Sequence, residues 1–110
     1  MIEVPLLIVN QDIREYATGM GWRLWRNNSG AGKVGDRFMR WGLCNESQAM
    51  NEMIKSSDYI GITDTGLFVA LEEKPHGWKY RATLREQAQL RFIKLVTEFG
   101  GIGSFIIRSK

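Results

Sequence analysis

Residues 58–74 read DYIGITDTGLFVALEEK, and this stretch constrains the fold more than any other part of the chain. Two runs rich in β-branched, aromatic and other apolar residues, 58–63 and 67–74, are separated by Asp64-Thr65-Gly66. That tripeptide suits a three-residue hairpin loop in which glycine takes the left-handed position. The stretch therefore predicts two antiparallel strands joined by a tight turn.

The length of this loop decides which side chains face each other across the hairpin. A three-residue loop places Thr63 opposite Leu67, and counting outward then places Asp58 opposite Glu72. Directly opposed side chains have Cβ atoms roughly 4.5–5.5 Å apart. Two carboxylates that close repel each other, so they are stable together only when one is protonated or a cation lies between them. The pattern predicts either a cation site or a surface hairpin with charged ends and no metal.

The end of the second strand carries further charged groups. Residues 67–71 are apolar on both faces, which is typical of a buried central strand, and the acids follow where that strand reaches the sheet edge. Alternation puts Lys74 on the same face as Glu72, and Glu73 on the other face. An aspartate, a glutamate and a lysine that converge in this way suit Mg²⁺ or Mn²⁺ with an ammonium group beside it. Such a site fits phosphodiester hydrolysis, in which lysine orients the nucleophile or stabilises developing charge.

The composition indicates a single domain that spans residues 1–110. Apolar residues make up 44% and charged residues 25%, which is ordinary for a globular protein and excludes disorder as the main state. No window holds the roughly 18 uninterrupted apolar residues of a membrane span, and the start lacks the basic region of a secretory signal. The single cysteine, Cys44, excludes an internal disulfide and a cysteine-rich zinc site. We therefore expect a cytoplasmic protein with no membrane partner.

Charge is unevenly distributed along the chain. Residues 22–41 carry five bases and one acid, and residues 74–110 carry eight bases and two acids. The intervening residues 42–73 carry one base and six acids. A basic surface attracts polyanions such as nucleic acid, and acids within a basic surround would repel phosphate unless a metal ion intervened. The alternative is a solvated surface with chance clusters of charge.

The remaining sequence predicts an α/β fold in which helices flank a mixed central sheet. The first expected element is a helix capped by Asn10 and ended by Gly21, followed by a strand at 22–26, a loop at 27–36 and a strand at 37–43 that pairs with the strand at 22–26. A helix from Asn45 to about 55 then precedes the two hairpin strands. The last elements are a helix that begins with a capping box at 83–86 and stops at Gly100-Gly101, and a strand at 102–107. The apolar face expected for the last helix consists of Leu84, Ala88, Phe92, Leu95, Val96 and Phe99.

Three other signals do not predict an enzyme site of their own. Residues 30–35 match G-x-G-x-x-G, but a strand and not a helix follows, so we expect no dinucleotide or other small-molecule cofactor. This loop either contacts phosphate through Lys33 and main-chain N–H groups or is a plain glycine-rich loop. His76 lies in a Pro-His-Gly turn, which predicts a solvated loop histidine. Lys79 and Arg81 follow the acidic strand, where they either flank a nucleic acid or belong to a solvated loop.

Several segments together resemble the virus-type replication-repair nuclease (VRR-NUC) domain of the PD-(D/E)xK nuclease superfamily. Asp58 with Glu72-Glu73-Lys74 forms the D…E-x-K skeleton of the superfamily. Four further segments resemble motifs of the VRR-NUC branch in the right order: Trp25–Ala31 the R-N-x-G turn, Arg40–Leu43 the R-F-G-L strand, Ser57–Ile62 the S-D-x-I-G motif, and Gln89–Gly101 the closing Q-x-x-F-L…V…G-G helix.

The resemblance implies a metal-dependent DNA endonuclease with a PD-(D/E)xK-type fold. Stand-alone, phage-type members of the family form homodimers that cut branched DNA such as four-way (Holliday) junctions, whereas fused members act on flaps and crosslink-repair intermediates. By match, Asp58 and Glu72 would bind Mg²⁺ or Mn²⁺, and Lys74 would be the catalytic lysine. The main-chain carbonyl of Glu73, which stands where the family usually has an apolar residue, would be a further metal ligand. Gln89 matches the glutamine of the closing helix and would assist.

Geometry on the last helix also favours Gln89 over Gln87, since Gln87 shares the charged face and Gln89 lies at the margin of the apolar stripe. Glu15, on the first helix where the family often has a further acid, falls opposite Ile13 and Ala17 and is expected to face solvent. The candidate DNA contacts are Arg26, Lys33, Lys79, Arg81 and Arg85. The alternatives to a junction nuclease are a non-catalytic nucleic-acid-binding module and a flap-type nuclease.

Overall fold

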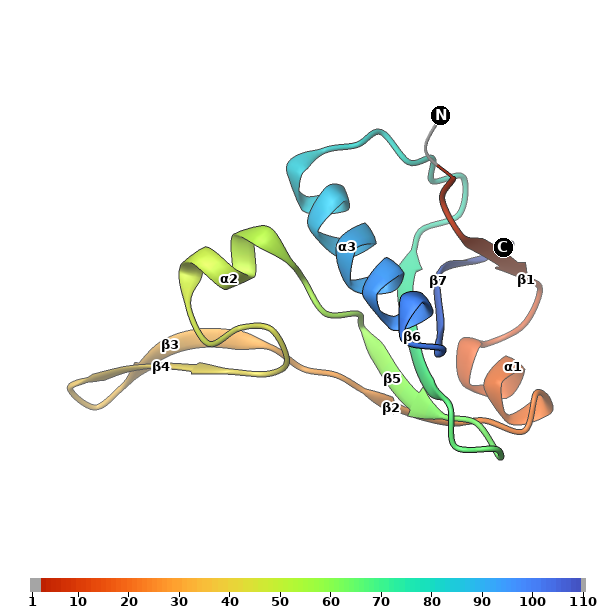
Figure 1. Cartoon of the computed structure of the whole chain (residues 1–110), viewed down its shortest axis with the longest axis horizontal. Helices are drawn as coiled ribbons and strands as arrows, with labels where there is room; N and C mark the ends of the chain where they lie inside the picture. Colours follow the sequence, from red (N-terminus) through yellow and green to blue (C-terminus); the bar gives the residue numbers. More distant parts are fainter. Residues whose placement is uncertain (1–2, 110) are drawn as a thin grey trace.

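A five-stranded mixed sheet with the order β1-β7-β6-β5-β2 forms the body of the protein, in a computed structural model that describes residues 3–109 (Figure 1). Strands β3 and β4 form a separate two-stranded sheet. The elements are β1 (Leu6–Val9), α1 (Ile13–Gly19), β2 (Arg23–Arg26), β3 (Gly30–Val34), β4 (Arg37–Trp41), α2 (Gln48–Met53), β5 (Tyr59–Ile62), β6 (Phe68–Lys74), α3 (Leu84–Glu98) and β7 (Ile102–Arg108). The predicted single α/β domain with a mixed sheet and flanking helices is confirmed. No helix within residues 3–109 is long and apolar enough to cross a bilayer.

The β5–β6 hairpin has the register that its sequence predicts. Tyr59 pairs with Leu71, the Thr63 N–H donates to the Leu67 carbonyl at 2.9 Å, and Gly66 has a φ of +89°. The loop is therefore the three-residue turn with glycine in the left-handed position. Continued outward, this register brings residue 58 opposite residue 72.

Strand β6 is the central strand, and its two faces are covered by different helices (Figure 1). Val69 and Leu71 pack with residues of α1, and Ala70 packs with Phe92 and Val96 of α3. The side chains at 69–71 are fully buried, as the apolar run at 67–71 predicts. Because strand side chains alternate, Glu72 faces α3 with Ala70, and Glu73 faces the α1 side.

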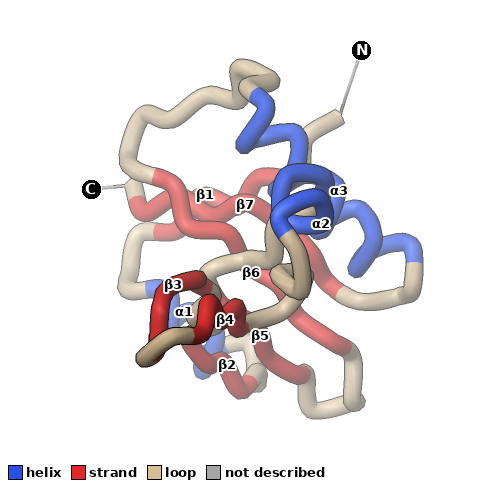
Figure 2. Tube along the Cα trace, turned by 90° about the vertical axis from the view of Figure 1, so that its left-hand side faces the viewer, coloured by secondary structure: helices blue, strands red, loops and turns tan. Residues whose placement is uncertain are grey.

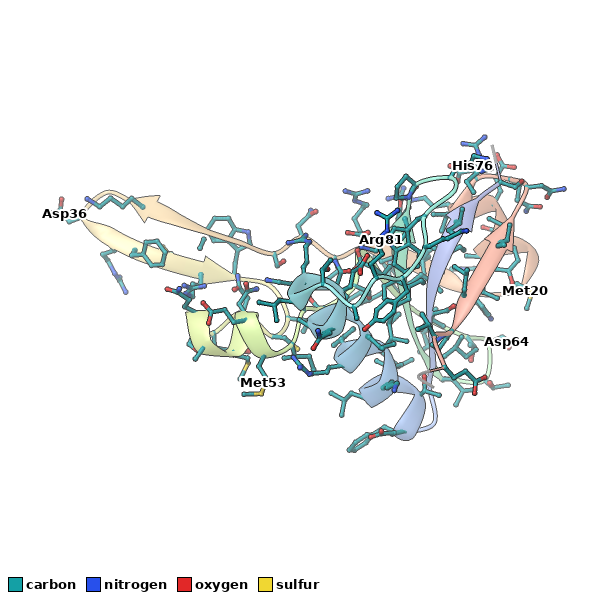
Figure 3. The ribbon with its side chains drawn as sticks, turned by 90° about the horizontal axis from the view of Figure 1, so that it is seen from above. Met20, Asp36, Met53, Asp64, His76 and Arg81 are labelled. Carbon is teal, nitrogen blue, oxygen red and sulfur yellow. The ribbon has the colours of Figure 1, made fainter. Side chains whose placement is uncertain are left out.

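Residues 27–58 leave the main sheet at the end of β2 and return beside it at β5, because Arg26 pairs directly with Tyr59. Within this excursion β3 and β4 form a narrow arm that projects from the body, with Asp36 at its outer end (Figures 1 and 3). At the root of the arm the buried Asn45 amide donates to the carbonyls of Gly30 at 2.7 Å and Trp41 at 2.9 Å. Helix α2 lies beside α3 (Figure 2).

Three sequence predictions about strands are wrong. The expected loop at 27–36 contains β3, and the strand at 37–43 pairs with β3 and not with the strand at 22–26, which pairs instead with β5. Strand β1, which the sequence analysis missed, pairs in parallel with β7. In the glycine-rich β3 the Trp41 ring lies against Gly30, where an added Cβ would come within 2.7 Å of the ring.

The helix ends also differ from the prediction in part. Asp12, not Asn10, caps α1, and Ser47, not Asn45, caps α2. The capping box of α3 is present as predicted. Leu84 and Phe99, expected in the core, are about 84% and 85% exposed because they lie at the two ends of α3, beyond the part of the helix that packs on the sheet. Leu95 is 39% exposed.

Glu86 ties the loop before α3 to the helix, and its loss is expected to destabilise the protein. Its buried carboxylate accepts hydrogen bonds from Trp78 Nε1 at 2.9 Å and from the N–H groups of Arg81 at 2.9 Å and Thr83 at 3.1 Å. Glu86→Ala removes all three acceptor contacts, so the free energy of unfolding should fall by about 2 kcal/mol or more. Urea denaturation measures the change. Glu98→Ala, at an exposed site on the same helix, is the control, and equal losses in the two variants would contradict the assigned role.

Candidate metal and nucleic-acid site

Asp58 lies immediately before β5, at the point where the excursion returns to the sheet. Its carboxylate takes the place of a strand carbonyl: Oδ2 accepts from the main-chain N–H of Glu73 at 3.0 Å. Its own carbonyl accepts from the Asn27 N–H at 2.8 Å. The Asn27 amide donates in turn to the Ser56 hydroxyl at 2.9 Å and to the Ser57 carbonyl at 2.8 Å. These contacts fix the Asp58 carboxylate against β6.

Glu72 is only 5% exposed and lies beside Asp58 on the α3 face of the sheet. Burial, followed by hydrogen bonding with Asp58 and repulsion from its charge, raises the pKa of Glu72 from 4.5 to about 8. Lys74 and Arg85 act in the opposite direction and lower it. The structure thus brings together the two carboxyl groups that the hairpin register predicts, and without a cation their environment favours the protonated form of one of them.

Lys74 and Gln89 form a direct pair on the same face of the sheet. Lys74 Nζ donates to Gln89 Oε1 at 2.7 Å, and the Gln89 side chain is 3% exposed. The ammonium group also lies 5.3 Å from the centroid of the Trp78 ring and 5.7 Å from that of Phe105. Gln87, in contrast, donates to the Ala82 carbonyl at the start of α3. The choice of Gln89 over Gln87 as the glutamine that reaches the sheet is confirmed.

A polar cleft of about 290 Å³ opens between the root of the arm, the end of α2 and the first turns of α3. Of the four predicted catalytic residues, Asp58, Glu72 and Gln89 lie in its wall, and Lys74 does not. Its other lining residues are polar, small or basic, and they are Asn27, Ser29, Gly30, Ala31, Arg40, Asn45, Asn51, Lys55, Ser56, Ser57 and Arg85. The cleft therefore combines two acids with three cationic side chains.

Arg85 is the one candidate DNA contact from the sequence analysis that lines this cleft. Arg26 is on the opposite, α1 side, where its Nη1 donates to the Tyr59 hydroxyl at 3.4 Å, because directly paired strand residues share a face. Lys33 is exposed on the arm, and Lys79 and Arg81 are exposed in the loop between β6 and α3. His76 lies in the same loop and is exposed, and Glu15 faces solvent, both as predicted.

Glu73, at the position where the family usually has an apolar residue, has a solvent-exposed side chain. Its Oε1 accepts from the Tyr59 hydroxyl at 3.5 Å. The charged side chain is thus accommodated on the α1 side without entering the core, and the Glu73 N–H is the donor that holds Asp58.

Arg40 and Lys55 line the cleft and were not among the predicted DNA contacts. Arg40 Nη1 donates to the Asn45 Oδ1 at 3.2 Å, and Lys55 Nζ donates to the Asn51 Oδ1 at 2.6 Å. The Lys55 N–H also donates to the Ala88 carbonyl of α3 at 3.1 Å. These residues reach the cleft because residues 27–58 fold back on α3. No local sequence pattern predicts that contact.

Within residues 3–109, no three histidine, cysteine, aspartate or glutamate side chains gather into a potential metal-binding group. A metal in the cleft would have two carboxylates and would complete its shell with main-chain oxygen and water. Mg²⁺ is commonly bound in this way, through one or two carboxylates with several waters retained.

No family model, curated protein or solved structure matches the chain. The resemblance to VRR-NUC nucleases therefore stays a prediction that rests on the motifs quoted above.

Proposed function

We propose that the protein is a Mg²⁺- or Mn²⁺-dependent DNA endonuclease of the PD-(D/E)xK type, similar to the stand-alone VRR-NUC nucleases. The observation that carries the proposal is the position of Asp58 and Glu72, opposed by the hairpin register, in the wall of a cleft that is otherwise polar and basic. A buried carboxylate such as Glu72 beside a second acid costs stability unless it is neutralised, and the surrounding cations would attract a phosphate chain.

The donor set of the cleft suits a hard divalent cation. Asp58 and Glu72 would supply carboxylate oxygens, and the Glu73 carbonyl, next to the N–H that holds Asp58, would be the main-chain ligand. The raised pKa of Glu72 supports this fit, because a bound cation would offset the burial and the repulsion that raise it. When bound, a divalent ion would neutralise phosphate charge and lower the pKa of an attacking water.

Lys74 and Gln89 would hold the reacting groups in place. Gln89 Oε1 accepts one hydrogen bond from the Lys74 ammonium and so fixes its position, while the ammonium has further donors for a phosphate oxygen or for the attacking water. Gln89 is buried and acts through Lys74, as a positioning residue. The cationic groups of Arg40, Lys55 and Arg85 would bind the flanking phosphates.

By the same resemblance, we propose that the substrate is branched DNA, above all the four-way junction. The resemblance also leads us to propose that the protein acts as a homodimer. The test incubates the protein with labelled four-way junction, flap and linear duplex DNA in Mn²⁺, Mg²⁺ or EDTA. We expect cutting of the branched forms in either metal and none in EDTA. Binding without metal-dependent cutting would favour a non-catalytic binding module, and preferential cutting of the flap would favour a flap-type nuclease.

Calorimetric titration with Mn²⁺ separates the metal site from a purely structural hairpin. The wild type should give a specific heat of binding that Asp58→Asn removes. If both proteins give none, the acid pair is not a metal site and the proposed chemistry fails.

A further inference from the structure

The two faces of the β3–β4 arm differ in chemistry. Lys33 pairs with Phe38, and Ala31 pairs with Arg40, so these four side chains share one face of the two-stranded sheet. Ala31 and Arg40 are also in the wall of the cleft that holds the acid pair. This face, which we call the cleft face of the arm, therefore continues the basic lining of the cleft outward along the arm.

The opposite face of the arm carries Val34, Arg37, Met39 and Trp41. Its aromatic ring, the Trp41 indole, lies against Gly30 and is 49% exposed. The aromatic ring of the cleft face, Phe38, is more exposed and has the Arg40 guanidinium against it.

Phe38 is about 62% exposed. The Arg40 guanidinium lies 5.4 Å from the centroid of the Phe38 ring, which connects the ring to the cleft lining. An exposed ring with a guanidinium against it and an exposed lysine opposite it has the parts of a single-strand platform: a surface on which a base stacks, and cations for the adjoining phosphates.

We propose that the cleft face of the arm holds the DNA strand that leaves the cleft, with an unpaired base stacked on Phe38 and phosphates bound by Lys33 and Arg40. The inference rests on the proposed function and deepens it. It makes unpaired nucleotides beside the cut site a feature that the protein recognises, and so gives a structural reason for a branched or gapped substrate over a continuous duplex.

The charges on the arm fit this occupant. Residues 30–41 carry three bases and one acid, and the acid, Asp36, is at the outer tip, away from the cleft (Figure 3). Acids near the root of the arm, Glu46 and Glu52, belong to the segment around α2 and are exposed. Neither of them lines the cleft.

The test measures DNA affinity by fluorescence anisotropy in EDTA, with a gapped duplex and a fully paired duplex of the same length as probes. Phe38→Ala should raise the Kd for the gapped DNA by roughly tenfold and leave the Kd for paired DNA unchanged. Lys33→Ala should weaken binding of both probes and reduce the slope of log K against log salt by about one. All these side chains are exposed, and thermal unfolding checks that each variant folds.

Controls come from the opposite face of the same arm. Met39→Ala is the apolar control for Phe38→Ala, and Arg37→Ala is the charge control for Lys33→Ala. Each control should change the Kd for DNA less than the variant with which it is compared. Equal effects on the two faces, or no effect on either, would overturn the inference.

Cutting assays on the same variants separate the two proposals. If the wild type cuts DNA in a metal-dependent way and Phe38→Ala binds gapped DNA as tightly as the wild type, the proposed role of the arm is rejected and the proposed nuclease activity is retained. Selective loss of gapped-DNA binding in Phe38→Ala, in a protein that never cuts DNA, would support the arm and reject the nuclease. A wild type that binds neither probe in EDTA and cuts no DNA in Mn²⁺ would reject both.

Discussion

Glu72→Gln is expected to abolish metal-dependent DNA cutting, with a loss of about a hundredfold or more, while the protein stays folded. Glutamine has nearly the shape of glutamate, so the buried site on the α3 face stays filled. It has no negative charge, so it removes one of the two carboxylates that would hold the cation. The repulsion from Asp58 that raises the pKa of Glu72 also disappears, so no loss of stability is expected. Cleavage rates in Mn²⁺, with circular dichroism as the check on folding, measure the outcome.

The matched control is Asp64→Asn, which removes one carboxylate from the other end of the same hairpin. Asp64 is exposed in the turn between β5 and β6, distant from the cleft lining. The control should cut DNA at the wild-type rate. If Glu72→Gln also cuts DNA at the wild-type rate, Glu72 is not a metal ligand. This conclusion does not depend on the roles assigned to the other residues.

The acid pair and its surroundings were predictable because few contacts determine them. One turn of defined length sets which residues of β5 and β6 oppose, and alternation then assigns Glu72 and Lys74 to one face. The capping box fixes where α3 begins, and helical periodicity turns Gln89 toward the sheet. Each step is local in sequence, so each could be made without knowledge of the whole fold.

The excursion was not predictable in the same way, because distant contacts decide its path. Asn45 resembles a helix cap in the sequence, yet its amide is used to join the ends of β3 and β4. Asn27 likewise ties the start of the excursion to its end at Ser57. Strand β1 has only four residues and pairs with β7, near the other end of the chain. Arg40 and Lys55 reach the cleft through these contacts, and therefore no spacing pattern selects them.

The metal-free protein is expected to lose stability as the pH rises from about 4.5 to about 8. Burial first, and then the contact with Asp58, raises the pKa of Glu72 from 4.5 to about 8 in the folded protein. The folded state therefore binds a proton at this site more tightly than the unfolded chain does. The stabilisation is complete below the unfolded pKa and is lost as the pH rises through the folded one. Thermal unfolding in EDTA across this range measures the effect as a fall in Tm.

Glu72→Gln isolates this titration from those of all other groups, because its side chain stays neutral. The difference in Tm between the variant and the wild type should widen from pH 4.5 to about 8 and stay constant above it. Mn²⁺ should act in the opposite sense, because it binds the deprotonated carboxylate. Its stabilisation of the wild type should therefore grow over the same range, and Glu72→Gln should lack it. Parallel Tm curves for the two proteins in EDTA would mean that Glu72 is already ionised in the folded protein, which would remove the electrostatic reason for placing a cation between Asp58 and Glu72.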